Sequence, residues 1–290
     1  MAAIDDKPVM QQTGRSTGLF SQLDRVHPIT WLVVVFLLFV PAFTNDFVQF
    51  QIFGWAFILG MISLSLMLLA GYGGMVSLVQ MSVAACAGYM VAIFGDSAVK
   101  EISLGWPWWA AVPIALLIAV GVGTISGALS VRTEGIYTIM ITLAIASAFF
   151  YFTRQNYTIF NGFSGFNSVL PPPLFGIDWR AATPFYYVSL FFAALSYLIV
   201  LYVSKSPFGL ALQGIRDNAR RMSALGYNVT AHRIAAYSFA SLIAAVAGIL
   251  LTWQNSQISP GTAGIARVID ILIIAVGGGV VGDLAGFGAA

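Results

Sequence analysis

The sequence has very little charge. Asp, Glu, Lys and Arg make up 8% of its 290 residues, whereas soluble domains average about 25%. This scarcity excludes an ordinary water-soluble domain, and the net charge of +2 gives the chain no electrostatic basis for binding nucleic acid. Hydrophobic residues reach 59%, so we expect lipid to surround most of the chain.

Cysteine and histidine are also scarce. The single cysteine, Cys86, cannot form an intrachain disulfide, and its apolar surroundings indicate a small buried side chain rather than a metal ligand. The segment GFSG (162–165) has the pattern of an intramembrane serine protease, whose nucleophile needs a histidine base. The only histidines, His27 and His232, are expected on the opposite side of the membrane from Ser164, and this placement argues against a hydrolase. No metal site is expected.

Long charge-free windows predict membrane-spanning helices, since a span needs roughly 20 apolar residues. Barrel strands would alternate with period two, and these windows do not. We therefore expect an all-α, polytopic transmembrane helical bundle of about eight spans, with residues 1–27 as a tail and 28–290 as the membrane domain. A tight turn at 71–74 would join the second and third spans, and the last span would be cut short. The expected spans are 28–45, two within 47–95, 106–131, 135–153, 184–204, 234–253 and 267 to the end.

The positive charges fall unevenly between the loops. Most Lys and Arg residues lie on the same side of the predicted spans as the N-terminus, and this side is normally cytoplasmic. We therefore expect a cytoplasmic N-terminus and a cytoplasmic loop at 205–233, which we call the 205–233 loop.

Within the 205–233 loop, apolar residues recur every three or four positions and predict an amphipathic helix over 209–225. Pro207 would separate this helix from the preceding span, and Gly226 would end it. Its arginines could bind anionic headgroups, or act only as a topology anchor, or the helix could dock into a groove of a partner protein.

Specific motifs carry a family resemblance. GLALQGIRDN (209–218) and ALGYNV (224–229) look like the cytoplasmic signature of ABC-transporter permeases of the branched-chain amino-acid import family. The resemblance extends over GYGGMVSLVQ (71–80), RTEGIYTIMITLA (132–144) and NGFSGF (161–166).

The resemblance implies a permease that works with a second permease subunit, two ATP-binding subunits and a periplasmic solute-binding protein. The chain has no G-x-x-x-x-G-K-[ST] phosphate loop, so we expect no cofactor on it and place ATP and Mg²⁺ in the partner ATPase. The residues expected to couple to that ATPase are Gly209, Ile215, Arg216, Asp217, Asn218, Ala224, Leu225 and Gly226.

Two further groups of residues are candidates for the site. Broken helices let transporters place polar groups in lipid, although the glycines at 71–74 would equally suit a simple turn. The candidates for the translocation path are Gly73, Gly74, Ser77, Gln80, Tyr137 and Thr142. The candidates for an external loop, either a flexible turn or an entrance near the binding protein, are Gly162, Ser164 and Gly165.

The function expected is ATP-driven import of a small polar or zwitterionic solute, a branched-chain amino acid, across the bacterial inner membrane by alternating access. Two alternatives remain open. One is an ABC permease for urea or short amides, and the other is a stand-alone channel or secondary transporter.

Overall fold

The computed structural model describes residues 36–41, 43–133, 135–172, 179 and 181–277. The chain divides into two units, Met1–Thr44 and Asn45–Ala290. In the first unit residues 36–41 are helical. Residues 28–35 and 42 of the expected first span, all of the expected tail and residues 278–290 of the expected last span lie outside the described residues.

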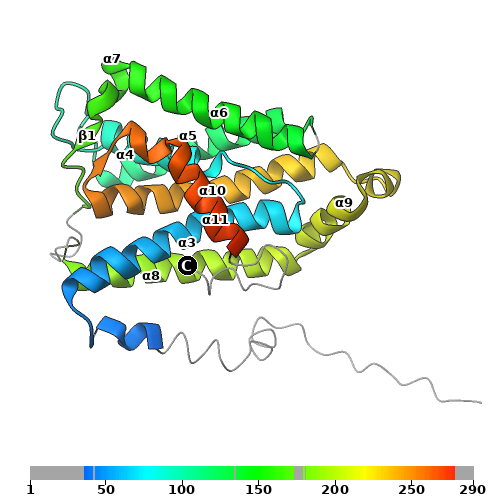
Figure 1. Ribbon diagram of the computed structural model, residues 1–290, viewed down its shortest axis with the longest axis horizontal. Helices are drawn as coiled ribbons and strands as arrows, with labels where there is room; N and C mark the ends of the chain where they lie inside the picture. The colour runs from blue at the N-terminus through cyan, green and yellow to red at the C-terminus, as the bar shows by residue number, and fades with distance from the viewer. Residues whose placement is uncertain (1–35, 42, 134, 173–178, 180, 278–290) are drawn as a thin grey trace, which may run out of the picture. The chain divides into compact units, whose positions relative to one another are not determined.

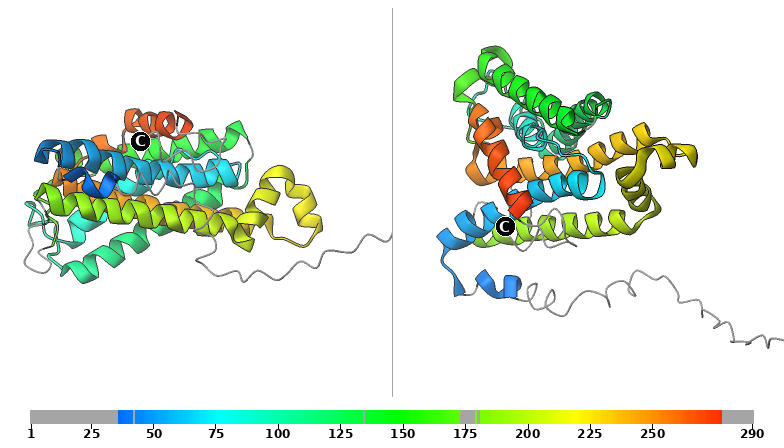
Figure 2. Two further views of the ribbon diagram at one scale, coloured as in Figure 1. Left: turned by 90° about the horizontal axis from the view of Figure 1, so that it is seen from below. Right: turned by 45° about the vertical axis from the view of Figure 1, so that its right-hand side comes forward.

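The second unit is built almost entirely from helices (Figures 1 and 2). Two short strands pair as an antiparallel ladder, β1 (Phe166–Asn167) with β2 (Gln257–Ile258). The π and 3-10 segments are η1 (Val48–Phe53), η2 (Leu68–Tyr72), η3 (Gly162–Ser164) and η4 (Pro260–Ala263). The α-helices are α3 (Gly54–Met67), α4 (Gln80–Phe94), α5 (Trp108–Ser130), α6 (Ile136–Gln155), α7 (Tyr157–Phe160), α8 (Ala182–Lys205), α9 (Pro207–Ala224), α10 (Val229–Asn255) and α11 (Ile265–Gly277).

The all-α class is confirmed, but the count of eight spans is not. Within the described residues, 5 helical segments are long and apolar enough to cross a membrane. They are the continuous run η1–α3–η2 and the helices α5, α6, α8 and α10. Helix α4 is apolar but has only 15 residues, about 22 Å of helix, whereas a membrane core is about 30 Å thick.

Close packing of small residues fixes α10 at the centre of this unit, against α4 and α5. A Cβ on Gly248 of α10 would collide with the backbone of Ala84 in α4. A Cβ on Gly88 of α4 would likewise collide with the Thr252 hydroxyl. Helices in lipid associate through such small residues because they allow the backbones to approach closely, so these contacts set the position of α4.

The tight turn expected at 71–74 is wrong. The helix continues through Tyr72, and residues 73–79 then form an irregular segment that turns back toward α4 before the helix resumes at Gln80 (Figure 1). Gly73 donates its N–H to Leu69 O at 3.1 Å, and Gly74 takes a positive φ of 64°. These glycines permit the change of direction, but no second helix follows them directly.

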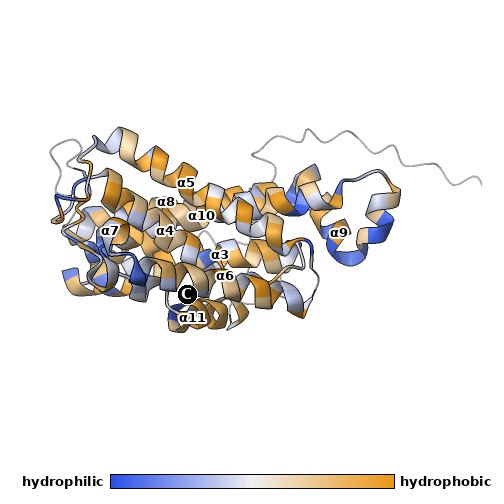
Figure 3. Cartoon of the chain, turned by 90° about the horizontal axis from the view of Figure 1, so that it is seen from above, coloured by the Kyte–Doolittle hydropathy of each residue, from blue (hydrophilic) through white to orange (hydrophobic). Residues whose placement is uncertain are grey.

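Polar residues gather at the two ends of the bundle, as the hydropathy colouring shows (Figure 3). Helix α9 forms one end. The β1–β2 ladder, α7 and their connecting loops lie at the other (Figure 1). The apolar helices between them are what a multi-pass membrane protein requires.

Candidate functional site

The first part of the candidate site is the irregular segment at 73–79. The amide of Met75 donates to Leu69 O at 3.0 Å, and that of Leu78 donates to the Thr142 hydroxyl of α6 at 3.2 Å. Thr142 is fully buried. A side chain from another helix thus supplies a hydrogen bond that a continuous helix would have made internally.

Gln80 begins α4 inside the protein. Its side chain is 1% exposed, and neither Oε1 nor Nε2 has a hydrogen-bond partner in the described part of the chain. Ser77, also 1% exposed, lies beside it on the wall of a small cavity. The predicted path residues Ser77, Gln80 and Thr142 are therefore all buried around the start of α4.

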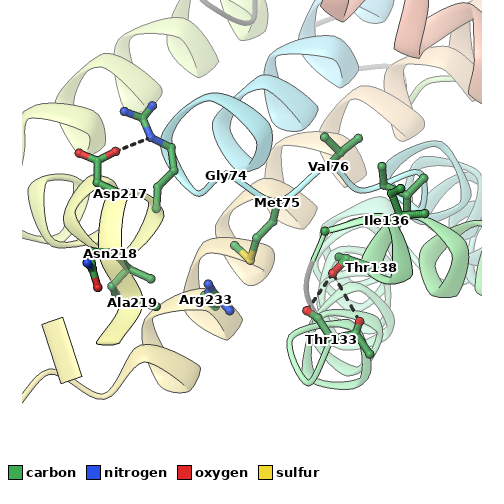
Figure 4. A pocket seen from close by; sticks show the side chains of 14 residues that line it. Gly74, Met75, Val76, Thr133, Ile136, Thr138, Asp217, Asn218, Ala219 and Arg233 are labelled. Carbon is green, nitrogen blue, oxygen red and sulfur yellow. Dashed lines mark hydrogen bonds and ion pairs between the residues drawn. The ribbon is translucent and has the colours of Figure 1, made fainter. Parts of the chain in front are cut away.

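The second part is a cavity of about 520 Å³ at the α9 end of the bundle (Figure 4). It brings together three segments that are far apart in the sequence: 74–76, the start of α6 and the middle of α9. Arg233 of α10, which is partly buried, also contributes to the wall. Gly74 of the predicted path thus lines the same cavity as the predicted coupling residues Ile215, Arg216, Asp217 and Asn218.

Arg216 connects the two parts of the site. Its Nη1 donates a hydrogen bond to Gly71 O at 2.5 Å, and its Nε lies 3.1 Å from the Asp217 carboxylate. Its aliphatic stem lies against Gly74, where a Cβ would meet Cγ of Arg216. The arginine of α9 therefore contacts the chain on both sides of the point where the helix stops.

Helix α9 differs from the single detached helix expected over 209–225. It starts at Pro207 because Ser206 caps it, the Ser206 hydroxyl accepting from the Gly209 N–H at 3.3 Å. It then breaks at Asn218, whose φ of −157° and ψ of 92° are not helical. The Asn218 side chain accepts from Arg221 N at 2.9 Å and so caps the second part.

The two parts of α9 have different surroundings. In the first part Gly209, Leu212 and Ile215 are buried, and a Cβ on Gly209 would collide with carbonyl groups at the end of α8. Gly209 and Ile215, both expected to face a partner, therefore pack within this chain. Arg216, Asp217 and Asn218 are exposed and line the cavity.

The second part of α9 and the turn after it are open to the surroundings. Ala224, Leu225, Gly226 and Tyr227 are exposed, Leu225 by 67%. Gly226 has a φ of 91°, which confirms its expected place after the helix. We call residues 219–227 the exposed tip.

The segment 132–144 contributes to the cavity through other residues than the predicted Tyr137. Tyr137 is 70% exposed and does not line the cavity, so its place in the translocation path stays a prediction. Thr133 and Thr138 do line it, and the Thr138 hydroxyl donates to Thr133 O at 2.8 Å. Both belong to the motif that carried the resemblance, but no periodicity marked them.

The expected external loop lies at the other end of the bundle. Gly162 and Gly165 both take positive φ, and a Cβ on Gly165 would collide with Ile258 O. Asn161 Nδ2 donates to Gly165 O at 2.7 Å. The glycines thus belong to a hydrogen-bonded loop that leads into β1, the strand that pairs with β2, while Ser164 is exposed. Its role as an external entrance stays a prediction.

Apolar spans, an interrupted buried helix and a cavity beside a polar loop define a multi-pass membrane protein of the transport class. Among the residues with a described position, no cluster of His, Cys, Asp or Glu could hold a metal ion. The model of one family matches residues 48–290, and its description is branched-chain amino acid transport system, permease component. The chain belongs to this family of ABC-transporter permeases.

Individual relatives are more distant. The chain is 23% identical over 241 residues to the high-affinity branched-chain amino acid transport system permease protein LivM of Salmonella typhimurium, covering 75% of this chain and 53% of the relative. It is 23% identical over 194 residues to the ribose import permease protein RbsC of Haemophilus influenzae, covering 66% of this chain and 58% of the relative. The chain thus spans about half the length of the LivM relative. No solved structure matches.

Membership of the family and the apolar spans together make this chain a multi-pass membrane protein of a transport permease family.

Proposed function

We propose that this chain is the permease subunit of an ATP-driven importer that moves branched-chain amino acids across the bacterial inner membrane by alternating access. The observation that carries the proposal is the Arg216 contact, which joins the loop helix α9 to the interruption between η2 and α4. A displacement of α9 would therefore be transmitted through this contact to the irregular segment at 73–79.

The exposed tip is the surface proposed to dock on an ATP-binding subunit. It offers an exposed leucine, an exposed tyrosine and the basic Arg220 and Arg221, in keeping with an apolar anchor within a charged rim. The complex would contain a second permease subunit, two ATP-binding subunits holding ATP and Mg²⁺, and a periplasmic binding protein. The N-terminus and α9 would face the cytoplasm, and the β1–β2 end the periplasm.

The free energy for import against a concentration gradient must come from the ATP-binding subunits. A solute shifts a conformational equilibrium only by its different affinity for the two states. Import against a gradient therefore needs ATP binding and hydrolysis to favour one state of the bundle through α9.

The test is uptake of labelled leucine by proteoliposomes that hold the complete complex. We expect uptake that requires ATP, the binding protein and this chain. Leucine flux through this chain alone, without an ATPase subunit, would instead support a channel or secondary transporter.

The solute needs its own test, because the chain is 23% identical both to a branched-chain amino acid permease, over 241 residues, and to a ribose permease, over 194 residues. Unlabelled leucine, ribose and urea are added in turn as competitors of labelled leucine uptake. We expect leucine to compete, and ribose and urea to have no effect.

A further inference from the structure

The first feature is the backbone at the start of α4. Gln80, Met81 and Ser82 are at most 2% exposed, and their N–H groups have no hydrogen-bond partner in the part of the chain that the structure describes. The preceding residue, Val79, supplies no side-chain cap. The first N–H groups of a helix normally bind a cap or water, and they mark the positive end of its dipole.

The second, independent feature is the Gln80 side chain. Both of its polar atoms lack a partner among the described residues although the side chain is 1% exposed. Gln254, which is also buried, instead donates its Nε2 to Phe50 O at 2.6 Å. Buried amides are almost always hydrogen-bonded, so one without any partner requires an explanation.

The third feature is the space beside these groups. Gln80 and Ser77 line a cavity of about 10 Å³, roughly the room of one water molecule. Leu66 of α3 and Val268 and Ile271 of α11 close its other side. The site is too small for an amino acid in this state, so the helices around it must separate before one can enter.

We infer that the start of α4 binds the carboxylate of an α-amino acid, with Gln80 as the specificity-determining side chain. This inference rests on the proposed function. The N–H groups and Gln80 Nε2 would donate to the carboxylate at the positive end of the helix dipole. Gln80 Oε1 would accept a hydrogen bond from the α-ammonium group. No acidic or basic side chain lines the cavity within the described ranges, as suits a solute that is neutral overall.

The experiment compares Gln80→Leu with the control Gln254→Leu in the complete transporter. Leucine removes the amide at a similar size. We expect Gln80→Leu to lower ATP-driven leucine uptake about tenfold or more, because a hydrogen bond to a charged group is lost. Its melting temperature should stay the same or rise, because an unbonded buried amide is removed.

Gln254→Leu should behave in the opposite way. It removes a bonded amide and with it the hydrogen bond to Phe50 O, so its melting temperature should fall, while the uptake per folded transporter stays near the wild-type value. A Gln80→Leu variant that loses stability and keeps uptake per folded transporter would overturn the inference.

The carboxylate is tested by displacing labelled leucine from the purified permease complex without the binding protein. Unlabelled leucine should displace it, whereas leucinol, which has no carboxylate, should need about tenfold more or higher concentrations. Equal displacement by leucinol would refute the carboxylate assignment. If the wild-type transporter takes up no leucine, the proposed function itself fails. Wild-type uptake with an unaffected Gln80→Leu variant refutes only the inference.

Discussion

Two buried helices, α10 and α4, lie against each other and begin in opposite ways. Helix α10 has 27 residues and starts at the exposed Asn228, whose side chain accepts a hydrogen bond from Ala231 N at 3.0 Å. Helix α4 has 15 residues and starts in the interior without a cap. The two helices therefore differ in role. The capped helix α10 is a scaffold, and α4 has an uncapped N-terminus inside the bundle.

The contact between the two helices can be broken at Gly248. A leucine there would push its Cβ into the backbone of Ala84, which cannot rotate away as a side chain can. We expect Gly248→Leu to destabilise the protein by about 3 kcal/mol or more and to abolish recovery of a monodisperse complex in detergent. Gly121→Leu is the control, because nothing lies within 4 Å of a Cβ at Gly121. Equal recovery of both variants would show that the close contact is not needed.

The exposed tip precedes α10 and can be tested at Leu225. We expect Leu225→Asp to abolish co-purification with the ATP-binding subunit, because a charge replaces an apolar anchor. Leu210 is a matched control, since it lies in the first part of α9 and is 61% exposed against 67% for Leu225. Leu210→Asp should keep the association. Loss of association in both variants, or in neither, would argue against docking at the tip.

The link from α9 to the interruption before α4 depends on Arg216. Arg216→Ala removes the donor to Gly71 O and the stem that packs on Gly74. We expect ATP-driven leucine uptake to fall about tenfold, as for a lost charge-assisted hydrogen bond, while the ATPase subunit still binds. The control is Arg132→Ala, at another exposed arginine. If Arg216→Ala takes up leucine at the level of this control, Arg216 does not couple α9 to the segment at 73–79.

The smallest effect is expected at the cap of α10. Asn228→Ala removes the acceptor for Ala231 N and should lower stability by about 1 kcal/mol, measured as a small fall in melting temperature. Asn228→Ser keeps a capping oxygen and should retain most of the stability. A fall with serine as large as that with alanine would contradict the capping role.

Much of this fold could be predicted because lipid imposes simple rules. The spans at α5, α6, α8 and α10 were visible as long charge-free windows, and the end of α9 at Gly226 followed from the tolerance of glycine for positive φ. The apolar run from Phe47 to Gly95 was ambiguous, since composition alone cannot show where a helix stops inside lipid. The interruption at 73–79 depends on tertiary partners such as Thr142, which lies 64 residues from Leu78.

The site could be predicted only in part, because it too depends on contacts between residues that are far apart in the sequence. Gln80 stood out as an amide in an apolar run, and Arg216 stood out within a charged loop. Periodicity showed that Gly209 and Ile215 belong to an apolar face of α9, but it could not show that this face packs on the chain itself. Arg233 of α10 and Thr138 of α6 line the cavity beside α9, and no pattern in the sequence shows that these three helices border one cavity.

The central claim is that the uncapped N-terminus of α4 becomes accessible to the solute during transport. The most direct test measures the accessibility of a cysteine placed beside it. Cys86 is the only cysteine and is buried, so Cys86→Ala gives a background in which Ser77→Cys can be labelled alone. Ser77 is 1% exposed, and we expect its thiol to react with a water-soluble maleimide at least about tenfold faster during ATP turnover with the binding protein than without nucleotide, because buried thiols are inert. Ser189→Cys, at a fully buried position in α8, should stay unreactive throughout. Equally slow labelling of Ser77→Cys with and without ATP turnover would contradict the claim that the N-terminus of α4 becomes accessible during transport.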